Sequence, residues 1–124
     1  MTTTNKTVDD VMSTPLEMIS KDATLEEAAT LMTDREISAL VVSTDPASII
    51  TSTDIVAAAA DGHAPADLLV SDVMTKSVET VPPDLYLQQV AAMMTNFGIK
   101  HLPVTDGDDY IGMVSSTDVA AQLS

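Results

Sequence analysis

The chain has 124 residues and a mass of 13.0 kDa, which is the size of one compact domain, and 45% hydrophobic residues are enough to bury an ordinary core. Its 19 acidic residues outnumber 5 basic ones and give a net charge of −14, which would repel a nucleic-acid backbone. No apolar run reaches the roughly 20 residues that cross a bilayer, and nothing at the start is typical of a signal peptide. We therefore expect a cytoplasmic protein that has neither a nucleic acid nor a membrane as its partner.

Two further features of the composition bear on its chemistry. The sequence has no cysteine, so disulfides, thiolate catalysis and cysteine metal sites are excluded, and no metal site is predicted. The acidic, lysine-poor composition is similar to that of proteins from salt-loving organisms, in which salt screens the repulsion between surface carboxylates.

An internal repeat organises the chain. At a distance of 62 residues, Val8, Asp10, Val11 and Met12 match Val70, Asp72, Val73 and Met74, and the same spacing holds as far as Val42 and Val104. The distance then becomes 64 residues, so that Ser52-Thr53-Asp54 matches Ser116-Thr117-Asp118. The second copy therefore has two more residues in one turn.

The first half of each copy predicts a helical turn, a short strand and a helix. Apolar residues at helical spacing indicate the turns at residues 8–12 and 70–74, and short strands follow at 16–19 and 78–81. Thr24 and Glu27 form a capping-box pattern that opens the first helix, whereas Pro82-Pro83 precedes the second. Gly98 suits a left-handed cap at the end of the second helix; because Glu36 stands at the matching position, we expect the first helix to end differently.

Two strands and an alanine-rich helix complete each copy. The strands are predicted at 37–43 and 48–52, then at 99–105 and 110–115, with a tight turn at Asp106-Gly107 in the second hairpin. The last helices begin near Thr53 and Thr117. The predicted fold class is α/β (α+β): two tandem β-α-β-β-α repeats related by a pseudo-twofold axis, with small sheets face to face and helices outside. The expected boundaries are a tail at 1–6, repeat 1 at 7–62, a linker at 63–69 and repeat 2 at 70–124.

Each copy has a hydroxyl and a carboxylate where its last strand meets its last helix. Thr51 precedes Asp54 by three residues, and Ser115 precedes Asp118 in the same way. This pattern is a capping box, which needs no ligand. A helix start can also bind a phosphate through its N–H groups, and a nearby carboxylate can accept hydrogen bonds from a ribose diol. The two interpretations are compatible.

From Thr7 to Leu123, the order of elements and the motifs resemble a pair of CBS domains, the repeated module named after cystathionine beta-synthase. The family's nucleotide motif has a glycine, two apolar residues, Ser or Thr, two variable residues and Asp. The segment Gly112-Met113-Val114-Ser115-Ser116-Thr117-Asp118 matches it in full. The segment from Ser48 to Asp54 departs from it, with Ser48 in place of the glycine. The resemblance implies a cleft between the copies for an adenine nucleotide.

The resemblance also implies a role for particular residues. Asp118 and Asp54 would bind ribose hydroxyls, and Ser115 and Thr51 would lie near the phosphate or ribose. A strand that includes Ile99, Lys100, His101 and Pro103 would line the adenine pocket, and the segment Lys76, Ser77 and Val78 would close over the base. Thr117 is included in the predicted ligand-binding set. The first copy has Ala39 and Val41 where His101 and Pro103 stand, so the second copy is expected to hold the main site.

The leading hypothesis is a regulatory sensor that binds AMP, ADP, ATP or an adenosyl compound and modulates an unidentified partner protein in trans, as a homodimer. The ligand would be regulatory, and no prosthetic group is predicted. The alternative is a ligand-free interaction or dimerisation domain with a decayed nucleotide site. Because no nucleophile stands beside a base and the two histidines are far apart in sequence, we do not expect an enzyme.

Overall fold

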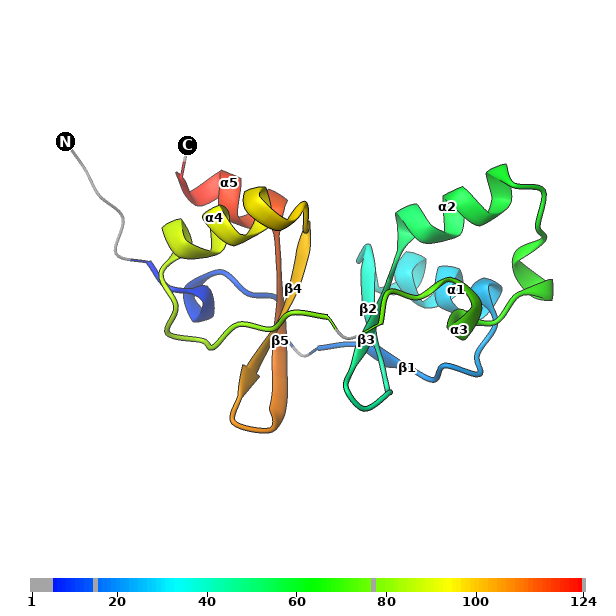
Figure 1. Ribbon diagram of the computed structural model, residues 1–124, viewed down its shortest axis with the longest axis horizontal. Coiled ribbons are helices and arrows are strands. Elements are labelled where there is room, and N and C mark those ends of the chain that lie inside the picture. The colour runs from blue at the N-terminus through cyan, green and yellow to red at the C-terminus, as the bar shows by residue number, and fades with distance from the viewer. Residues whose placement is uncertain (1–5, 15, 77, 124) are drawn as a thin grey trace. The chain divides into compact units, whose positions relative to one another are not determined.

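The computed structural model describes residues 6–14, 16–76 and 78–123, and the chain forms two compact units (Figure 1). Unit 1 is Met1–Leu16 with Glu79–Ser124, and unit 2 is Glu17–Val78. Each unit combines helices with a small sheet, which confirms the predicted mixed fold class. The units do not coincide with the sequence repeats, because each repeat's first turn is assigned to the unit of the other repeat.

Unit 2 is built on a three-stranded sheet in the order β1-β2-β3. Strand β1 pairs with β2 in parallel, and β2 pairs with β3 in the antiparallel sense. Its elements in chain order are β1 (Met18–Ile19), α1 (Leu25–Arg35), β2 (Ala39–Val42), β3 (Ser48–Thr51), α2 (Ser52–Ala60), the 3₁₀ turn η2 (Pro65–Asp67) and α3 (Val70–Val73).

Unit 1 repeats this pattern with a two-stranded hairpin. Its elements are the 3₁₀ turn η1 (Val8–Asp10), α4 (Leu87–Phe97), β4 (His101–Asp106), β5 (Asp109–Ser115) and α5 (Ser116–Leu123). The strand predicted at 78–81 is wrong for the described residues, since only one parallel bridge forms, between Val81 and Val104. The two prolines that follow Val81 have no N–H to donate, so the ladder ends there.

The caps of the two long helices, α1 and α4, agree with the sequence-based expectation at the start of α1 and the end of α4, but not at the end of α1. The Thr24 hydroxyl accepts a hydrogen bond from the Glu27 N–H at 3.1 Å, as predicted. Gly98 ends α4 in the left-handed conformation with a φ of 66°, but Glu36 does the same for α1 with a φ of 55°. The expectation of a different end at Glu36 was therefore wrong. The Ile37 N–H bonds the Met32 carbonyl at 3.0 Å, and satisfying the last carbonyls offsets the cost of this backbone conformation.

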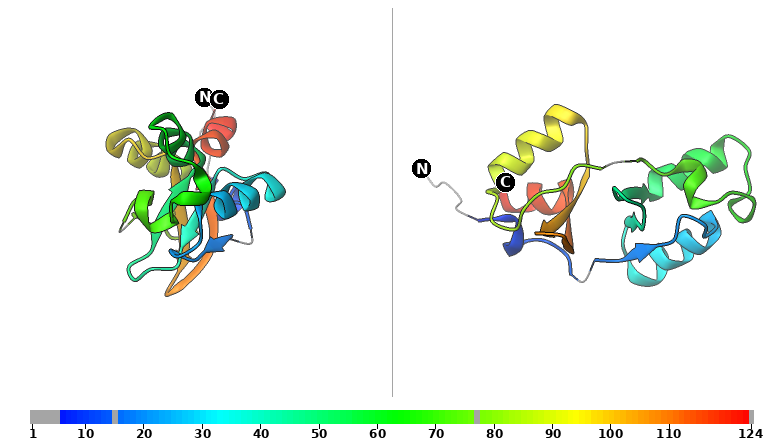
Figure 2. Two further views of the ribbon diagram at one scale, coloured as in Figure 1. Left: turned by 90° about the vertical axis from the view of Figure 1, so that its right-hand side faces the viewer. Right: turned by 60° about the horizontal axis from the view of Figure 1, so that its bottom comes forward.

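The first turn of each repeat packs in the core of the unit that contains the rest of the other repeat. Val8 of η1 is fully buried in the core of unit 1, together with Leu87, Val90 and Leu102. Val70 of α3 is fully buried in the core of unit 2. In Figures 1 and 2 the blue N-terminal turn accordingly lies with the yellow, orange and red elements of unit 1.

Backbone hydrogen bonds fix this exchange of turns at matching positions. In unit 1, the Val8 N–H bonds the Leu85 carbonyl at 3.0 Å; in unit 2, the Val70 N–H bonds the Ala23 carbonyl at 2.8 Å. Helix α4 of unit 1 and helix α1 of unit 2 are also held at their starts. The Leu87 N–H donates to the Lys6 carbonyl, and the Leu25 N–H donates to the Leu68 carbonyl. Both ends of the described chain meet in unit 1, where the Lys6 ammonium donates to the Gln122 side chain.

Candidate functional site

The two strand-to-helix junctions both form closed capping boxes. At β3–α2, Asp54 Oδ2 accepts hydrogen bonds from the Thr51 N–H at 2.9 Å and the Thr51 hydroxyl at 3.1 Å, and the Asp54 N–H donates to Thr51 Oγ1 at 3.3 Å. At β5–α5, Asp118 Oδ2 accepts from the Ser115 N–H at 3.3 Å, and the Asp118 N–H donates to Ser115 Oγ at 3.1 Å. The capping interpretation of the pattern therefore holds at both junctions.

The cap at β5–α5 occupies only part of Asp118. Oδ2 accepts the cap bond, and Oδ1 accepts no hydrogen bond from the described residues. Asp118 and Ser115 are both half-buried, so the remaining oxygen is within reach of solvent or a ligand. Thr117, in the same helical turn, is exposed. Helix capping thus leaves a carboxylate oxygen able to accept hydrogen bonds from a ligand.

The neighbouring strand adds side chains to the same sheet face. His101 lies opposite Ser115 in the β4–β5 ladder, and Pro103 lies opposite Met113. Directly opposed residues of antiparallel strands project from one face, so His101 and Pro103 flank the junction. The exposed Lys100 is tied to the helix start, since its carbonyl accepts from the Ser116 N–H at 2.9 Å.

The resemblance also implies that Ile99 lines the adenine pocket, and this residue lies two positions before β4. Its side chain is half-buried and packs against the core of unit 1, and its N–H bonds the Met94 carbonyl at 3.0 Å after the end of α4. The structure therefore places Ile99 in the packing beneath β4.

The matching face at the first junction is apolar. Ala39 lies opposite Thr51 and Val41 opposite Ile49, and these two strand β2 residues are buried. The face therefore lacks the imidazole that His101 brings to unit 1. At matching positions, β4 therefore has His101 and Pro103 where β2 has Ala39 and Val41.

Burial lowers the pKa of His101 below its ordinary value of 6.5. The nearby Asp118 carboxylate opposes this shift, and the positive charge of Lys100 adds to it. The imidazole is therefore neutral near pH 7 and contributes no positive charge to the junction.

We expect the stability of the protein to fall as the pH drops below about 6.5, because the unfolded chain then binds a proton that the folded His101 resists. An NMR titration of His101 measures the underlying pKa. Asp118→Asn should lower that pKa further, and Lys100→Gln should raise it. Unchanged values in both variants would show that the three groups do not interact.

A backbone segment from the start of the chain covers β5. Ser13 bridges Met113 in the antiparallel sense: the Ser13 N–H bonds the Met113 carbonyl at 2.8 Å, and the Met113 N–H bonds the Ser13 carbonyl at 3.1 Å. A Cβ on Gly112 would lie 2.8 Å from Met12 Sδ and 2.9 Å from the Ser13 carbonyl oxygen. Glycine at this position is thus required by the close approach of Met12 and Ser13.

The corresponding segment of the second repeat covers β3 instead. Thr75 bridges Ile49, and the Val78 N–H bonds the Ala47 carbonyl at 3.2 Å. Lys76, which is exposed, and Val78 therefore lie in unit 2, while Ser77 lies outside the described residues. The covering segment in unit 1 is Met12–Thr14, which sequence reasoning missed. The repeat distance of 62 residues, which matches Thr14 to Lys76, could have indicated it.

Ser48 replaces the motif glycine in unit 2 and is almost completely buried, with 1% of its surface exposed. Its hydroxyl lies 2.7 Å from the Thr44 hydroxyl, which donates to the Pro46 carbonyl at 2.8 Å. The side chain is therefore accommodated by hydrogen bonds within the β2–β3 loop.

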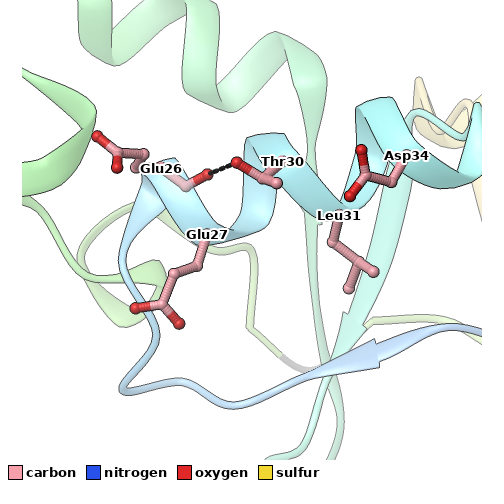
Figure 3. Close-up of a pocket in the computed structure, with 5 residues that line it drawn as sticks. All are labelled: Glu26, Glu27, Thr30, Leu31 and Asp34. Carbon is pink, nitrogen blue, oxygen red and sulfur yellow. Dashed lines mark hydrogen bonds between the residues drawn. The ribbon is translucent and has the colours of Figure 1, made fainter.

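A shallow depression on α1 in unit 2 is lined by Glu26, Glu27, Thr30, Leu31 and Asp34 (Figure 3). The Thr30 hydroxyl within it donates to the Glu26 carbonyl at 2.9 Å. With three carboxylates around it, this surface is unsuited to a phosphate, and it contains none of the predicted site residues.

Within residues 6–14, 16–76 and 78–123, no group of three or more His, Asp or Glu side chains is placed to hold a metal ion. No helix in these ranges is long and apolar enough to span a bilayer.

Comparison with known proteins identifies the class to which this fold and site belong. The family model described as "CBS domain" matches residues 8–61 and 70–124, so the chain belongs to the CBS-domain family. Pairs of CBS domains are regulatory modules.

Among curated proteins, the chain is 29% identical to the CBS domain-containing protein YhcV of Bacillus subtilis, over 91% of this chain and 82% of that protein. It is 36% identical to homoserine O-acetyltransferase of Methanohalobium evestigatum, over 91% of this chain but only 23% of the enzyme. The chain thus spans most of YhcV and less than a quarter of the acetyltransferase.

Solved structures show the same fold. The CBS domain pair of protein MJ0100, in complex with 5′-methylthioadenosine and S-adenosyl-L-methionine, matches with a TM-score of 0.86 and 27% identity, over 97% of both chains. A putative signal-transduction protein with CBS domains from Burkholderia ambifaria matches with a TM-score of 0.86 and 26% identity, over 95% of this chain and 93% of that one.

Proposed function

We propose that the protein is a ligand-sensing regulatory module that binds an adenine nucleotide or another adenosyl compound at the β5–α5 junction of unit 1. The observation that carries the proposal is the geometry of Asp118, whose Oδ2 caps the helix while Oδ1 is left for a ligand. A ribose diol has two hydroxyl donors, and a carboxylate can accept both. His101 stands opposite Ser115 on the same sheet face and provides a neutral imidazole beside the ligand.

Two further observations support this assignment. The motif from Gly112 to Asp118 is complete, and the CBS pair of MJ0100, similar over nearly the whole chain, was solved with two adenosyl compounds. The activity proposed is binding, with regulation exerted in trans on a separate partner protein. Assembly as a homodimer and a cytoplasmic location belong to the same proposal.

A ligand-free interaction domain is the second candidate function. It is favoured by the completeness of both capping boxes, which account for Thr51, Asp54, Ser115 and Asp118 without any ligand. The two functions differ in whether any adenosyl compound raises the melting temperature, because a ligand that binds only the folded state stabilises it.

Asp118→Asn should weaken adenosyl-ligand binding by roughly 10- to 100-fold, because hydrogen bonds to a charged group contribute about 1.5–3 kcal/mol. The asparagine side chain still has an oxygen for the cap, so the unliganded variant should lose less than about 1 kcal/mol of stability. Isothermal titration calorimetry with adenosine and AMP measures the affinity, and thermal unfolding measures the stability.

Asp54→Asn is the matched control, since it makes the same change in the capping box of unit 2. It should leave the affinity of the main site within about twofold of the parent value. Equal losses in the two variants would contradict the assignment of the main site to unit 1. If Asp118→Asn destabilised the protein but left the affinity unchanged, the ligand-free function would be favoured.

A further inference from the structure

His101 and Ser115 form the closer of the two kinds of side-chain pair in an antiparallel ladder. They are opposed in the β4–β5 hairpin, and the Ser116 N–H donates to the Lys100 carbonyl at 2.9 Å just beyond them. A bond at that position makes His101 and Ser115 a non-hydrogen-bonded pair, in which the Cα atoms are only about 4.5 Å apart. The Ser115 hydroxyl in turn accepts from the Asp118 N–H at 3.1 Å. The imidazole is therefore held beside the two residues that form the cap.

Two charged side chains act on the imidazole, and they have opposite signs. The Asp118 carboxylate favours the protonated form, and the neighbouring Lys100 ammonium opposes it. Helix α4 and the covering segment Met12–Thr14 have no ionisable side chain, and α5 has only Asp118. The remaining ionisable side chains of the hairpin lie at its turn, at the far end from His101: Asp106, Asp108, Asp109 and Tyr110. Protonation of His101 therefore places a new positive charge next to a single carboxylate.

A ligand on Asp118 and a proton on His101 compete for this junction. Burial is the largest cause of the lowered pKa of His101, and a ligand that covers the same sheet face removes more water and lowers the pKa further. Conversely, an imidazolium attracts the Asp118 carboxylate, whose Oδ1 is the oxygen left for ribose hydroxyls. Two binding equilibria on one protein change each other by the same factor. A ligand that lowers the pKa of His101 is therefore itself weakened by protonation.

We propose that His101 is a proton switch for the β5–α5 site, and that protonation of its imidazole in mildly acidic solution releases the ligand from Asp118. This inference rests on the proposed function and adds the regulation of the same site. The matching junction of unit 2 has Ala39 opposite Thr51, so it has no imidazole that could act in this way. The sensor then responds to its ligand and to pH together, and it binds the ligand fully only while His101 is neutral.

The direction of the pH dependence follows from the two states of His101. Its pKa lies below 6.5 in the free protein and, with a ligand bound, is lower still. The affinity is therefore full above the pKa of the free protein, falls as the pH drops through it, and levels off below the pKa of the complex. Each pH unit between the two pKa values weakens binding about tenfold. Lys100→Gln should raise the pKa of His101 and so move the loss of affinity to higher pH.

The test is a calorimetric titration of the whole chain with adenosine, which has no group that titrates in this range, at about pH 7.5 and about pH 5. We expect the dissociation constant to rise at least about threefold at the lower pH. His101→Gln should bind adenosine equally well at both pH values, whatever its affinity, because an amide does not titrate. His63→Gln is the matched control: it removes the other histidine of the chain, which is exposed in unit 2, and should keep the full pH dependence.

An NMR titration of His101 gives an independent measurement. Saturation with adenosine should lower the pKa of His101, and the size of this change must equal the logarithm of the full ratio of dissociation constants. Circular dichroism at each pH reports whether the chain is folded. A loss of affinity that coincided with unfolding of the parent protein would overturn the switch.

The outcomes separate the two proposals. Equal affinity of the parent for adenosine at both pH values, or the parent's pH dependence retained in His101→Gln, would overturn the switch while the proposed function stood. Binding of AMP without binding of adenosine at the higher pH would also overturn it, since the ribose would then not be the group that the proton displaces. If neither adenosine nor AMP bound at the higher pH, the proposed function itself would fail.

Discussion

A fragment of residues 17–78 should fold with native-like helical content, whereas a fragment of residues 7–62, which follows the sequence repeat, should be largely unfolded. The first fragment retains α3, with the fully buried Val70 and its backbone bond to Ala23. The second lacks α3, and its own η1 belongs to the core of unit 1. Circular dichroism of the two fragments measures the difference.

The size of the effect follows from the core. A unit of about 60 residues is only marginally stable, and loss of one buried aliphatic side chain with its contacts costs about 2–4 kcal/mol. Val70→Ala in the whole chain is the control, since it should destabilise unit 2 without removing any backbone. Equal ellipticity and equal melting temperatures for the two fragments would contradict the placement of η1 in the core of unit 1 and of α3 in the core of unit 2.

Gly112→Ala should destabilise the protein by about 1–3 kcal/mol and lower its Tm by about 4–12 °C, because the added methyl meets Met12 Sδ and the Ser13 carbonyl oxygen. The backbone carbonyl cannot move without breaking its bond to the Met113 N–H. Thermal unfolding of the unliganded variant gives the loss directly.

Two further variants test whether the loss of stability comes from this clash or would follow from any substitution in the motif. Ser48→Gly changes the matching position of unit 2 in the opposite direction and should cost at most about 1.5 kcal/mol, mainly the hydrogen bond to Thr44. Met12→Ala should recover part of the stability of Gly112→Ala, because it removes Met12 Sδ and Cγ, two of the three atoms that the methyl meets. A Gly112→Ala variant as stable as the parent would show that the covering segment moves aside.

The local elements could be predicted from the sequence because each depends on neighbouring residues. The capping hydroxyl of Thr24, the left-handed glycine at residue 98 and the alternating apolar strands act over a few positions. The strand at 78–81 failed because the chain passes from unit 2 to unit 1 within it: the Val78 N–H bonds the Ala47 carbonyl of unit 2, and Val81 forms a single bridge with Val104 of unit 1. Glu36 was misjudged because carbonyl satisfaction outweighed the preference for glycine.

The partners of each element could not be predicted in the same way. Val8 and Val70 occupy matching positions in the repeat. The spacing of apolar residues is equally compatible with each valine packing within its own repeat or in the other one. Their location depends on long-range packing and on bonds such as those to Leu85 and Ala23. The same difficulty affected the candidate site. The two strands of the hairpin were predicted, but its turn lies at Gly107-Asp108 instead of Asp106-Gly107, and this turn with a register shift after Val104 sets the pairing of His101 with Ser115. The Met12–Thr14 cover comes from a distant part of the sequence.

The meeting of Lys6 with Gln122 has a consequence for engineering the molecule. Because both ends of the described chain lie in unit 1, a short linker between them and a new opening in the turn after α2, near Gly62, would give a circular permutant. In that permutant the residues of unit 1 would follow one another without interruption, and unit 2 would be the divided one. A reporter domain fused at the present ends would be attached to the unit that contains Asp118, while one fused at the new ends would be attached to unit 2.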